Sequence, residues 1–230
     1  MPGAIVPLYT DPGPVWDALA KAIVETPDLP FAVILNPDSG AGLVRNDEYV
    51  SAIPAFSFAN VRLYGYIDTA YGKRDPAAIA AEIDNWKTWY GIDAIFFDDV
   101  DATDEVYYQR VCSDARAQGV GALIGNPGTP VARDFARHFD TVVVYEDTGY
   151  PELAPIEAAA AELGLDTLAI LVLGSPYDDA AIDVLIEHAH WIYVSERSSE
   201  HYETLPLVFD TLLDRLHIAN AADFELHPGL

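Results

Sequence analysis

Short runs of β-branched and aromatic residues alternate along the chain with longer, Ala-rich segments. Several short runs, such as AIFF at 94–97 and LAILVL at 168–173, are apolar at every position, which is typical of parallel strands covered on both faces. The pattern predicts eight strands: Gly3–Tyr9, Phe31–Asn36, Val61–Tyr66, Asp93–Asp98, Val120–Gly125, Thr141–Tyr145, Thr167–Leu173 and His190–Val194. Their starts lie 21 to 32 residues apart, so each strand is followed by room for one helix.

The segments between the strands show helical periodicity. The apolar residues that carry it are Ile79, Ile83, Trp86 and Tyr90 in one segment, and Leu205, Phe209, Leu212 and Leu216 in another. Eight strand–helix units without a large insertion predict an α/β fold, a (β/α)8 TIM barrel that occupies residues 1–230 as one domain. A doubly wound open sheet is the alternative, because the sequence does not show that the sheet closes.

The amino-acid composition excludes some classes of function for such a chain. Asp and Glu number 37 against 12 Lys and Arg, so the formal charge is 12 − 37 = −25. With 51% hydrophobic residues the chain is no disordered acidic tail, and it lacks the basic stripe that nucleic-acid binding requires. The acidic surplus is either a solvated, halophile-like surface or a negative cleft that attracts a cationic substrate.

The sequence shows no sign of a membrane span, a signal peptide or an intrachain disulfide. The apolar runs fall short of the ~20 residues of a membrane span, and the N-terminus lacks the basic and apolar regions of a signal peptide. As written the chain is therefore expected to be cytoplasmic, or secreted or on the cell surface if a leader has been trimmed. Cys112 is the only cysteine, so no intrachain disulfide can form.

No cofactor or metal ion is expected either. There is no Walker or dinucleotide glycine fingerprint. His188, His190 and His201 lack the usual metal-ligand spacing, and the acidic run 98–105 lacks the glycine and the spacing of a calcium loop.

Polar residues gather where the predicted strands end, which in a TIM barrel is the mouth that carries the chemistry. In chain order they are Tyr9 and Asp11; Asn36, Asp38 and Ser39; Tyr66, Asp68 and Tyr71; Asp98 and Asp99; Asn126; Glu146; and Glu196. Carboxylates, amides and tyrosines are thus predicted to share one face.

Two of these carboxylates have the positions of a catalytic pair. Asp98 ends an apolar strand and is predicted to be a nucleophile or an electrostatic stabiliser. Glu146, partly buried by Tyr145, is predicted to be a general acid with a raised pKa. Such a pair is what glycoside hydrolysis requires. Asp99 either joins the pair or caps the next helix, because adjacent strand residues point to opposite sides.

The remaining mouth residues suit a sugar better than a phosphate. Tyrosines offer flat faces for pyranose rings, and amides and hydroxyls offer hydrogen bonds. The candidate substrate-binding residues are Tyr9, Asn36, Asp38, Ser39, Tyr66, Tyr71, Asn126 and Glu196, with Trp191 as a further stacking candidate. The alternative is ordinary core packing and turn chemistry. Arg74 is predicted to be a salt-bridge partner rather than a catalytic residue.

Several of these segments, taken in order, resemble the spherulin-4 family. They are Val6–Tyr9 with Pro12, Gly13 and Trp16; Asn36–Gly40; Gly65–Gly72; Trp89–Tyr90; Ile95–Asp98; Asn126–Thr129; and Tyr145–Glu146. Some members of that family are endo-acting α-1,4-galactosaminidases of glycoside hydrolase family 135, with acidic catalytic residues at the ends of barrel strands four and six. The resemblance implies Asp98 and Glu146 as the pair. The family usually has Asp-Glu where this chain has Asp98-Asp99, so Asp99 is expected to assist through charge or hydrogen bonding.

The resemblance therefore implies an endo-acting glycosidase that cleaves an α-linked polysaccharide of galactosamine or N-acetylgalactosamine, including a cationic, partly deacetylated polymer. If the sugar is N-acetylated, its acetamido oxygen can replace Asp98 as the nucleophile. The alternative is a non-catalytic barrel that binds polysaccharide or acts at the cell surface. A metal-dependent barrel hydrolase is a third, weaker reading.

Overall fold

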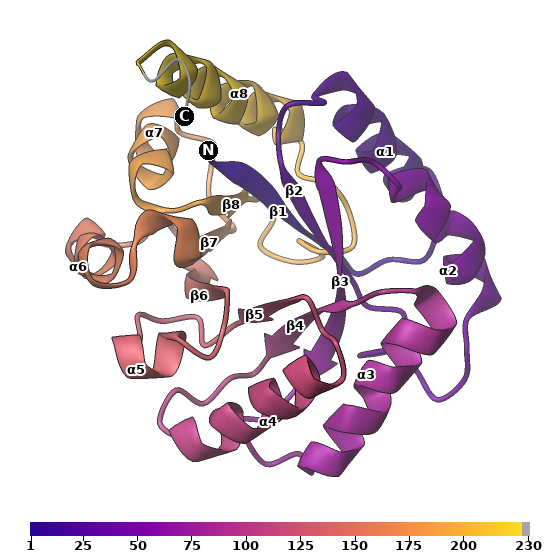
Figure 1. Ribbon diagram of the computed structural model, residues 1–230. Coiled ribbons are helices and arrows are strands. Elements are labelled where there is room, and N and C mark those ends of the chain that lie inside the picture. Colours follow the sequence, from indigo (N-terminus) through magenta and orange to yellow (C-terminus); the bar gives the residue numbers. More distant parts are fainter. Residues whose placement is uncertain (227–230) are drawn as a thin grey trace.

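The computed structural model, which describes residues 1–226, is a closed parallel barrel of eight strands in chain order, with helices around the outside (Figure 1). The strands are β1 (Gly3–Leu8), β2 (Phe31–Leu35), β3 (Val61–Asp68), β4 (Ala94–Asp98), β5 (Ala122–Gly125), β6 (Thr141–Thr148), β7 (Leu168–Leu173) and β8 (Trp191–Val194). Pairing of β1 with β8 closes the ring. The predicted (β/α)8 TIM barrel is confirmed, and the open-sheet alternative is wrong.

Helices follow the strands on the outside of the barrel (Figure 1). They are α1 (Pro14–Glu25), α2 (Asp47–Ala52), α3 (Pro76–Tyr90), α4 (Glu105–Ala117), α5 (Arg133–Ala136), α6 (Leu153–Leu163), α7 (Asp179–His188) and α8 (Phe209–Leu226), with short 3-10 turns at Ile53–Phe56 and Leu165–Thr167. Leu205 was expected in the last helix but precedes it. Pro206 explains this, because proline sits in the turn before a helix more readily than inside one.

Alternate strand residues enter two separate hydrophobic clusters. One fills the barrel and consists of Ile5, Ala32, Ile34, Tyr64, Ala94, Phe96, Ala122, Ile124, Val143, Ala169, Leu171, Leu173 and Tyr193. The other lies between strands and helices and includes Val6, Ile95, Phe97 and Trp86. Asp98 and Asn126 follow Phe96 and Ile124 by two residues. They therefore continue the inward-facing rows to the carboxyl end of the barrel.

A β-bulge in β6 decides which of its residues faces inward. Val143 pairs with Ala169, but the next paired residues are Tyr145 with Ile170 and Glu146 with Leu171, so Val144 is the extra residue. Leu171 belongs to the interior cluster and Ile170 to the outer one. The bulge therefore turns Glu146 into the barrel and Tyr145 away from it.

Among residues 1–226, no helix is both long enough and apolar enough to span a bilayer.

Candidate active site

Asn126 joins the two predicted catalytic carboxylates at the carboxyl end of the barrel. Its Nδ2 donates to Asp98 Oδ1 at 2.8 Å and also to Glu146 Oε2. Its Oδ1 accepts from the Gly128 amide at 3.1 Å, which fixes the orientation of the side-chain amide so that both N–H bonds face the carboxylates. The main chain of Asn126 is bonded to Phe97 O and Val100 N, so the end of β5 is held against the end of β4.

Two tyrosines complete the hydrogen bonding of the pair. Tyr66 Oη donates to Asp98 Oδ2 at 2.9 Å, and Tyr202 Oη donates to Glu146 Oε1. Each of the four carboxylate oxygens therefore accepts a hydrogen bond either from a phenol or from the Asn126 amide. Burial and the neighbouring carboxylate charge raise the pKa of both tyrosines well above 10, so both phenols stay protonated as donors.

The pKa of Asp98 is raised to about 6. Burial is the main cause and the charge of Glu146 the second, while hydrogen bonds from Tyr66, the Asp99 amide and Asn126 oppose the rise. The Asp98 carboxyl therefore gains and loses its proton near pH 6, next to the Glu146 carboxylate.

Tyr9 lies beside both donor tyrosines. Its ring contacts Tyr66 edge-on with centroids 5.4 Å apart, and Tyr202 likewise at 5.2 Å. Burial first, and the charges of Asp98 and Glu146 next, raise the pKa of Tyr9. The structure thus brings the predicted residues Tyr9, Tyr66, Asp98, Asn126 and Glu146 together in one cluster.

Asp99 and Tyr71 form a second, more exposed group at the rim. Asp99 has a left-handed backbone (φ 50°), so the chain turns sharply after Asp98 instead of continuing the strand. Its carbonyl accepts from the Tyr71 amide at 2.8 Å, and its carboxylate accepts a hydrogen bond from the Tyr71 hydroxyl, which raises the pKa of Tyr71. Asp104, rather than Asp99, caps the next helix by accepting from Tyr107 N.

The loop after β2 holds three further predicted residues. Asn36 Oδ1 accepts from the Gly40 amide at 2.7 Å and so closes the turn 36–40. Asp38 and Ser39 are exposed on that turn, with Ser39 in a left-handed conformation (φ 48°). The structure gives Asn36 a turn-closing role, and substrate contact by these three residues stays a prediction.

Arg74 and Glu82 connect this loop with the one after β3. The largely buried Glu82 accepts from the Ala41 amide at 2.9 Å and forms an ion pair with Arg74. Arg74 also donates to the Asp68 carbonyl at 2.9 Å. The prediction that Arg74 is a salt-bridge partner is confirmed.

Glu196 is turned toward its own loop. Its Oε1 accepts from Leu207 N at 3.0 Å, and this bond spans the segment between β8 and α8. The structure gives Glu196 a role in holding this segment, and substrate contact by Glu196 stays a prediction.

In comparison with known proteins, residues 3–216 match spherulation-specific family 4. The chain belongs to this family. That agrees with the resemblance seen in the sequence.

Two relatives of this spherulin-4 family member are informative. Spherulin-4 of Physarum polycephalum is 32% identical over 150 residues, which cover 63% of this chain but 45% of that protein, so the chain spans less than half of the relative's length. The crystal structure of Aspergillus clavatus Sph3 in complex with GalNAc is 25% identical, with a TM-score of 0.82 over 94% of this chain and 97% of that one.

A third similarity shows the fold alone. The spore cortex-lytic enzyme SleL of Bacillus cereus is 14% identical, with a TM-score of 0.52 over 76% of this chain and 52% of that one. This similarity supports the TIM-barrel fold.

Tyr202 is the site residue of this family member that sequence reasoning missed. It lies in the irregular segment between β8 and α8, eight residues beyond the end of a strand, where no periodicity points to it. Tyr145 was expected to bury Glu146, but the bulge turns it outward, and its hydroxyl donates to Gly149 O at 2.7 Å. Tyr202 takes the place expected for Tyr145.

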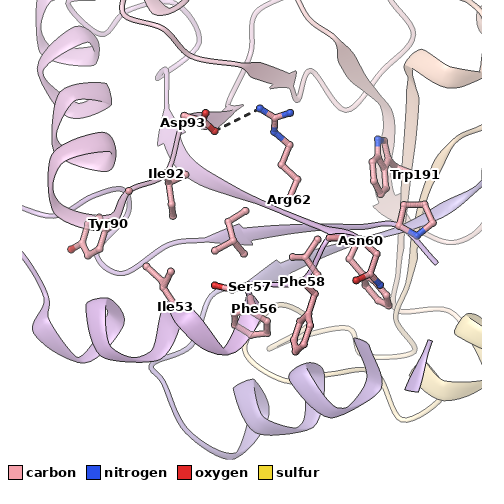
Figure 2. A pocket seen from close by; sticks show the side chains of 16 residues that line it. Ile53, Phe56, Ser57, Phe58, Asn60, Arg62, Tyr90, Ile92, Asp93 and Trp191 are labelled. Carbon is pink, nitrogen blue, oxygen red and sulfur yellow. Dashed lines mark ion pairs between the residues drawn. The ribbon is translucent and has the colours of Figure 1, made fainter. Parts of the chain in front are cut away.

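Trp191 is corrected as well. It begins β8 and therefore lies at the amino end of the barrel, opposite the carboxylate pair. There it lines a hollow of about 660 Å³, together with Phe58, Asn60, Arg62 and Asp93 (Figure 2). Although this hollow is large, it is remote from Asp98 and Glu146, so a stacking role for Trp191 at the mouth is wrong.

Within residues 1–226, no group of three or more His, Cys, Asp or Glu side chains is arranged to hold a metal ion.

Proposed function

We propose that this protein is a glycoside hydrolase that cleaves within an α-linked polysaccharide containing galactosamine or N-acetylgalactosamine. The observation that carries the proposal is the Asn126 amide shared by Asp98 and Glu146 at the barrel mouth. The similarity to Sph3, a protein whose structure was solved with GalNAc, supports the substrate class.

The shared amide sets the spacing of the pair. Two acceptors of one NH2 group, each ~2.9 Å from the nitrogen and ~120° apart, lie about 5 Å from one another. Retaining glycosidases keep their carboxyls ~5–5.5 Å apart, whereas inverting enzymes need ~6.5–9.5 Å to admit a water molecule between them. The geometry therefore supports retention of the anomeric configuration.

In this mechanism Glu146 gives its proton to the glycosidic oxygen as the bond to the anomeric carbon breaks. The Asp98 carboxylate attacks that carbon and forms a glycosyl ester, and Glu146 then takes a proton from the water that hydrolyses the ester. On an N-acetylated sugar the acetamido oxygen is the attacking group, and Asp98 would orient it. The Tyr9 and Tyr66 rings would form the floor on which the sugar sits, while Asp99 and Tyr71 would contact it at the rim.

The test is the release of reducing ends from a galactosamine or N-acetylgalactosamine polymer. Asp98→Asn and Glu146→Gln are each expected to reduce kcat by at least roughly 100-fold, the usual contribution of an acid–base residue, while the polymer still binds. Asp147→Asn, an exposed neighbour of Glu146 on β6, is the matched control and should leave the rate near that of the wild type.

The pH profile of the wild type tests how the roles are divided. Asp98 must be ionised to attack, so kcat/KM should rise with pH through about 6, the pKa of this carboxyl. A rate that instead falls as the pH rises through 6 would exchange the two roles. If the wild type binds these polymers but cuts none of them, the protein is a polysaccharide-binding barrel and the enzyme proposal fails.

A further inference from the structure

The segment between β8 and α8, residues 195–208, crosses back over the barrel beside β1 (Figure 1). Hydrogen bonds fix it to neighbouring strands and to the residues that follow them. Tyr9 N donates to Tyr202 O at 2.8 Å, Gly174 N donates to Arg197 O at 2.9 Å, and Tyr193 Oη donates to His201 O at 2.5 Å. The segment is therefore a defined part of the mouth.

The hydrogen bonding of this segment is otherwise incomplete. Four buried side-chain nitrogen or oxygen atoms lack a hydrogen-bond partner in the part of the chain that the structure describes, and three of them are Glu196 Oε2, Arg197 Nε and His201 Nδ1. Unpaired buried polar atoms cost stability. Because the segment carries three such atoms, we attribute its conformation to what it contributes to the site and not to its own stability.

The segment contributes the Tyr202 side chain to the site. Among the hydrogen bonds of the described residues, no other group of this segment reaches the carboxylate pair. The Tyr202 ring is held edge-on against Tyr9 and His201, with centroids 5.2 and 4.4 Å away. Its hydroxyl thereby meets Glu146 Oε1 from a fixed direction.

We propose that Tyr202 is the positioning residue of Glu146 and makes Oε1 the oxygen that carries the catalytic proton. This inference rests on the proposed function. Asn126, whose amide orientation is fixed by Gly128, can only donate to Oε2. A phenol hydroxyl can donate to a carboxylate and, after rotating, accept from a carboxylic acid. Oε1 can therefore gain and lose a proton without losing its neighbour, whereas Oε2 cannot.

Glu146 needs such fixing more than Asp98 does. A glutamate side chain has one more rotatable bond than an aspartate, so a single donor leaves its carboxylate free to turn. Donors on both oxygens, one from β5 and one from the segment after β8, define the plane of the carboxylate. Loss of the second donor should misalign the acid while the sugar still binds to the floor and the rim.

Tyr202→Phe, compared with Tyr145→Phe, tests this proposal. Both changes remove one tyrosine hydroxyl, but the Tyr145 hydroxyl, next to Glu146 on β6, donates to the Gly149 carbonyl and not to the pair. We expect Tyr202→Phe to lower kcat roughly 10- to 100-fold, the effect of losing a hydrogen bond to a charged group, with KM changed less than about twofold. The part of its pH profile that depends on Glu146 should move to higher pH, because the ionised form of Glu146 loses a donor. Tyr145→Phe should keep the wild-type pH profile.

A second measurement needs no activity. The Glu146 carboxyl can be followed by 13C NMR during a pH titration, with its signal assigned from Glu146→Gln. The midpoint should rise in Tyr202→Phe and stay at the wild-type value in Tyr145→Phe. If the midpoint rises but the wild type cuts no polymer, Tyr202 still positions Glu146, whereas the proposed function and the catalytic role of Oε1 both fail. An unchanged midpoint together with an unchanged kcat overturns the inference, whatever the wild type cuts.

Discussion

The surroundings of Asp98 disfavour the ionised form of its carboxyl group. Its carboxylate is half-buried beside Glu146, and three hydrogen-bond donors only partly compensate. Catalytic groups commonly have shifted pKa values, because a site arranged for the transition state can disfavour the charge that the group carries before the reaction. The cost should be measurable as stability.

Asp98→Asn is therefore expected to stabilise the protein above pH 6. Asp98 ionises near pH 3.8 in the unfolded chain and near 6 in the folded protein, so the free energy of unfolding decreases between these pH values, by about 3 kcal/mol in all. A neutral asparagine avoids this cost. Urea unfolding at pH 8 should show Asp98→Asn more stable than the wild type by up to about 3 kcal/mol.

Near pH 4 the same two proteins should differ by less than about 1 kcal/mol, because the folded wild type is then protonated at Asp98. This measurement needs dilute protein, since the sequence pI is about 4.2. An equal difference at both pH values would show that the gain comes from packing and not from charge.

Irregular backbone, whether a bulge within a strand or a long loop, separates what the sequence predicts from what it does not. Inward-facing residues of straight strands, such as Asp98 and Asn126, follow from alternation and from the position of each strand end. Glu146 does not, because strict alternation from Val143 would place it outside the barrel. Only the bulge at Val144 brings it in. Tyr202 is unpredictable for a related reason: a long irregular segment has no period that tells where a side chain points.

The link between the loops after β2 and β3 leads to a prediction of its own. Glu82→Ala removes the acceptor of the Ala41 amide and leaves Arg74 without its ion pair. We expect a loss of about 2 kcal/mol in the free energy of unfolding, less than for a fully buried pair because Arg74 is partly exposed. KM should rise if the turn at 36–40 contacts the polymer.

Glu157→Ala is a suitable control for Glu82→Ala. Glu157 is exposed on α6, and its contact with His188 is a long one of 4.0 Å. Its removal should therefore change the free energy of unfolding by less than about 0.5 kcal/mol. Equal losses in the two variants, measured by urea unfolding, would contradict a role for Glu82 in holding the loops together.

The charge of the whole molecule remains negative whatever pairs form. Even if each of the 12 basic residues neutralised one carboxylate, 37 − 12 = 25 acidic residues would have no basic partner. Many are on exposed helix surfaces, such as Asp17 and Asp84, where solvation accounts for them. Others surround the mouth at Asp11, Asp38, Asp68 and Asp99, close to the place where the polymer would enter.

This distribution predicts that salt slows the enzyme on a cationic polymer and not on a neutral one. A partly deacetylated galactosamine polymer is positively charged, so the field of the mouth should raise its association rate. Between about 10 mM and 500 mM salt the Debye length falls from roughly 30 Å to below 8 Å, and kcat/KM on this polymer should fall by roughly tenfold or more. The fully N-acetylated polymer is the internal control, because it carries no charge and should be cut at nearly the same rate throughout. Equal salt dependence on both polymers would mean that the acidic residues act on solubility alone and that the mouth does not select for charge.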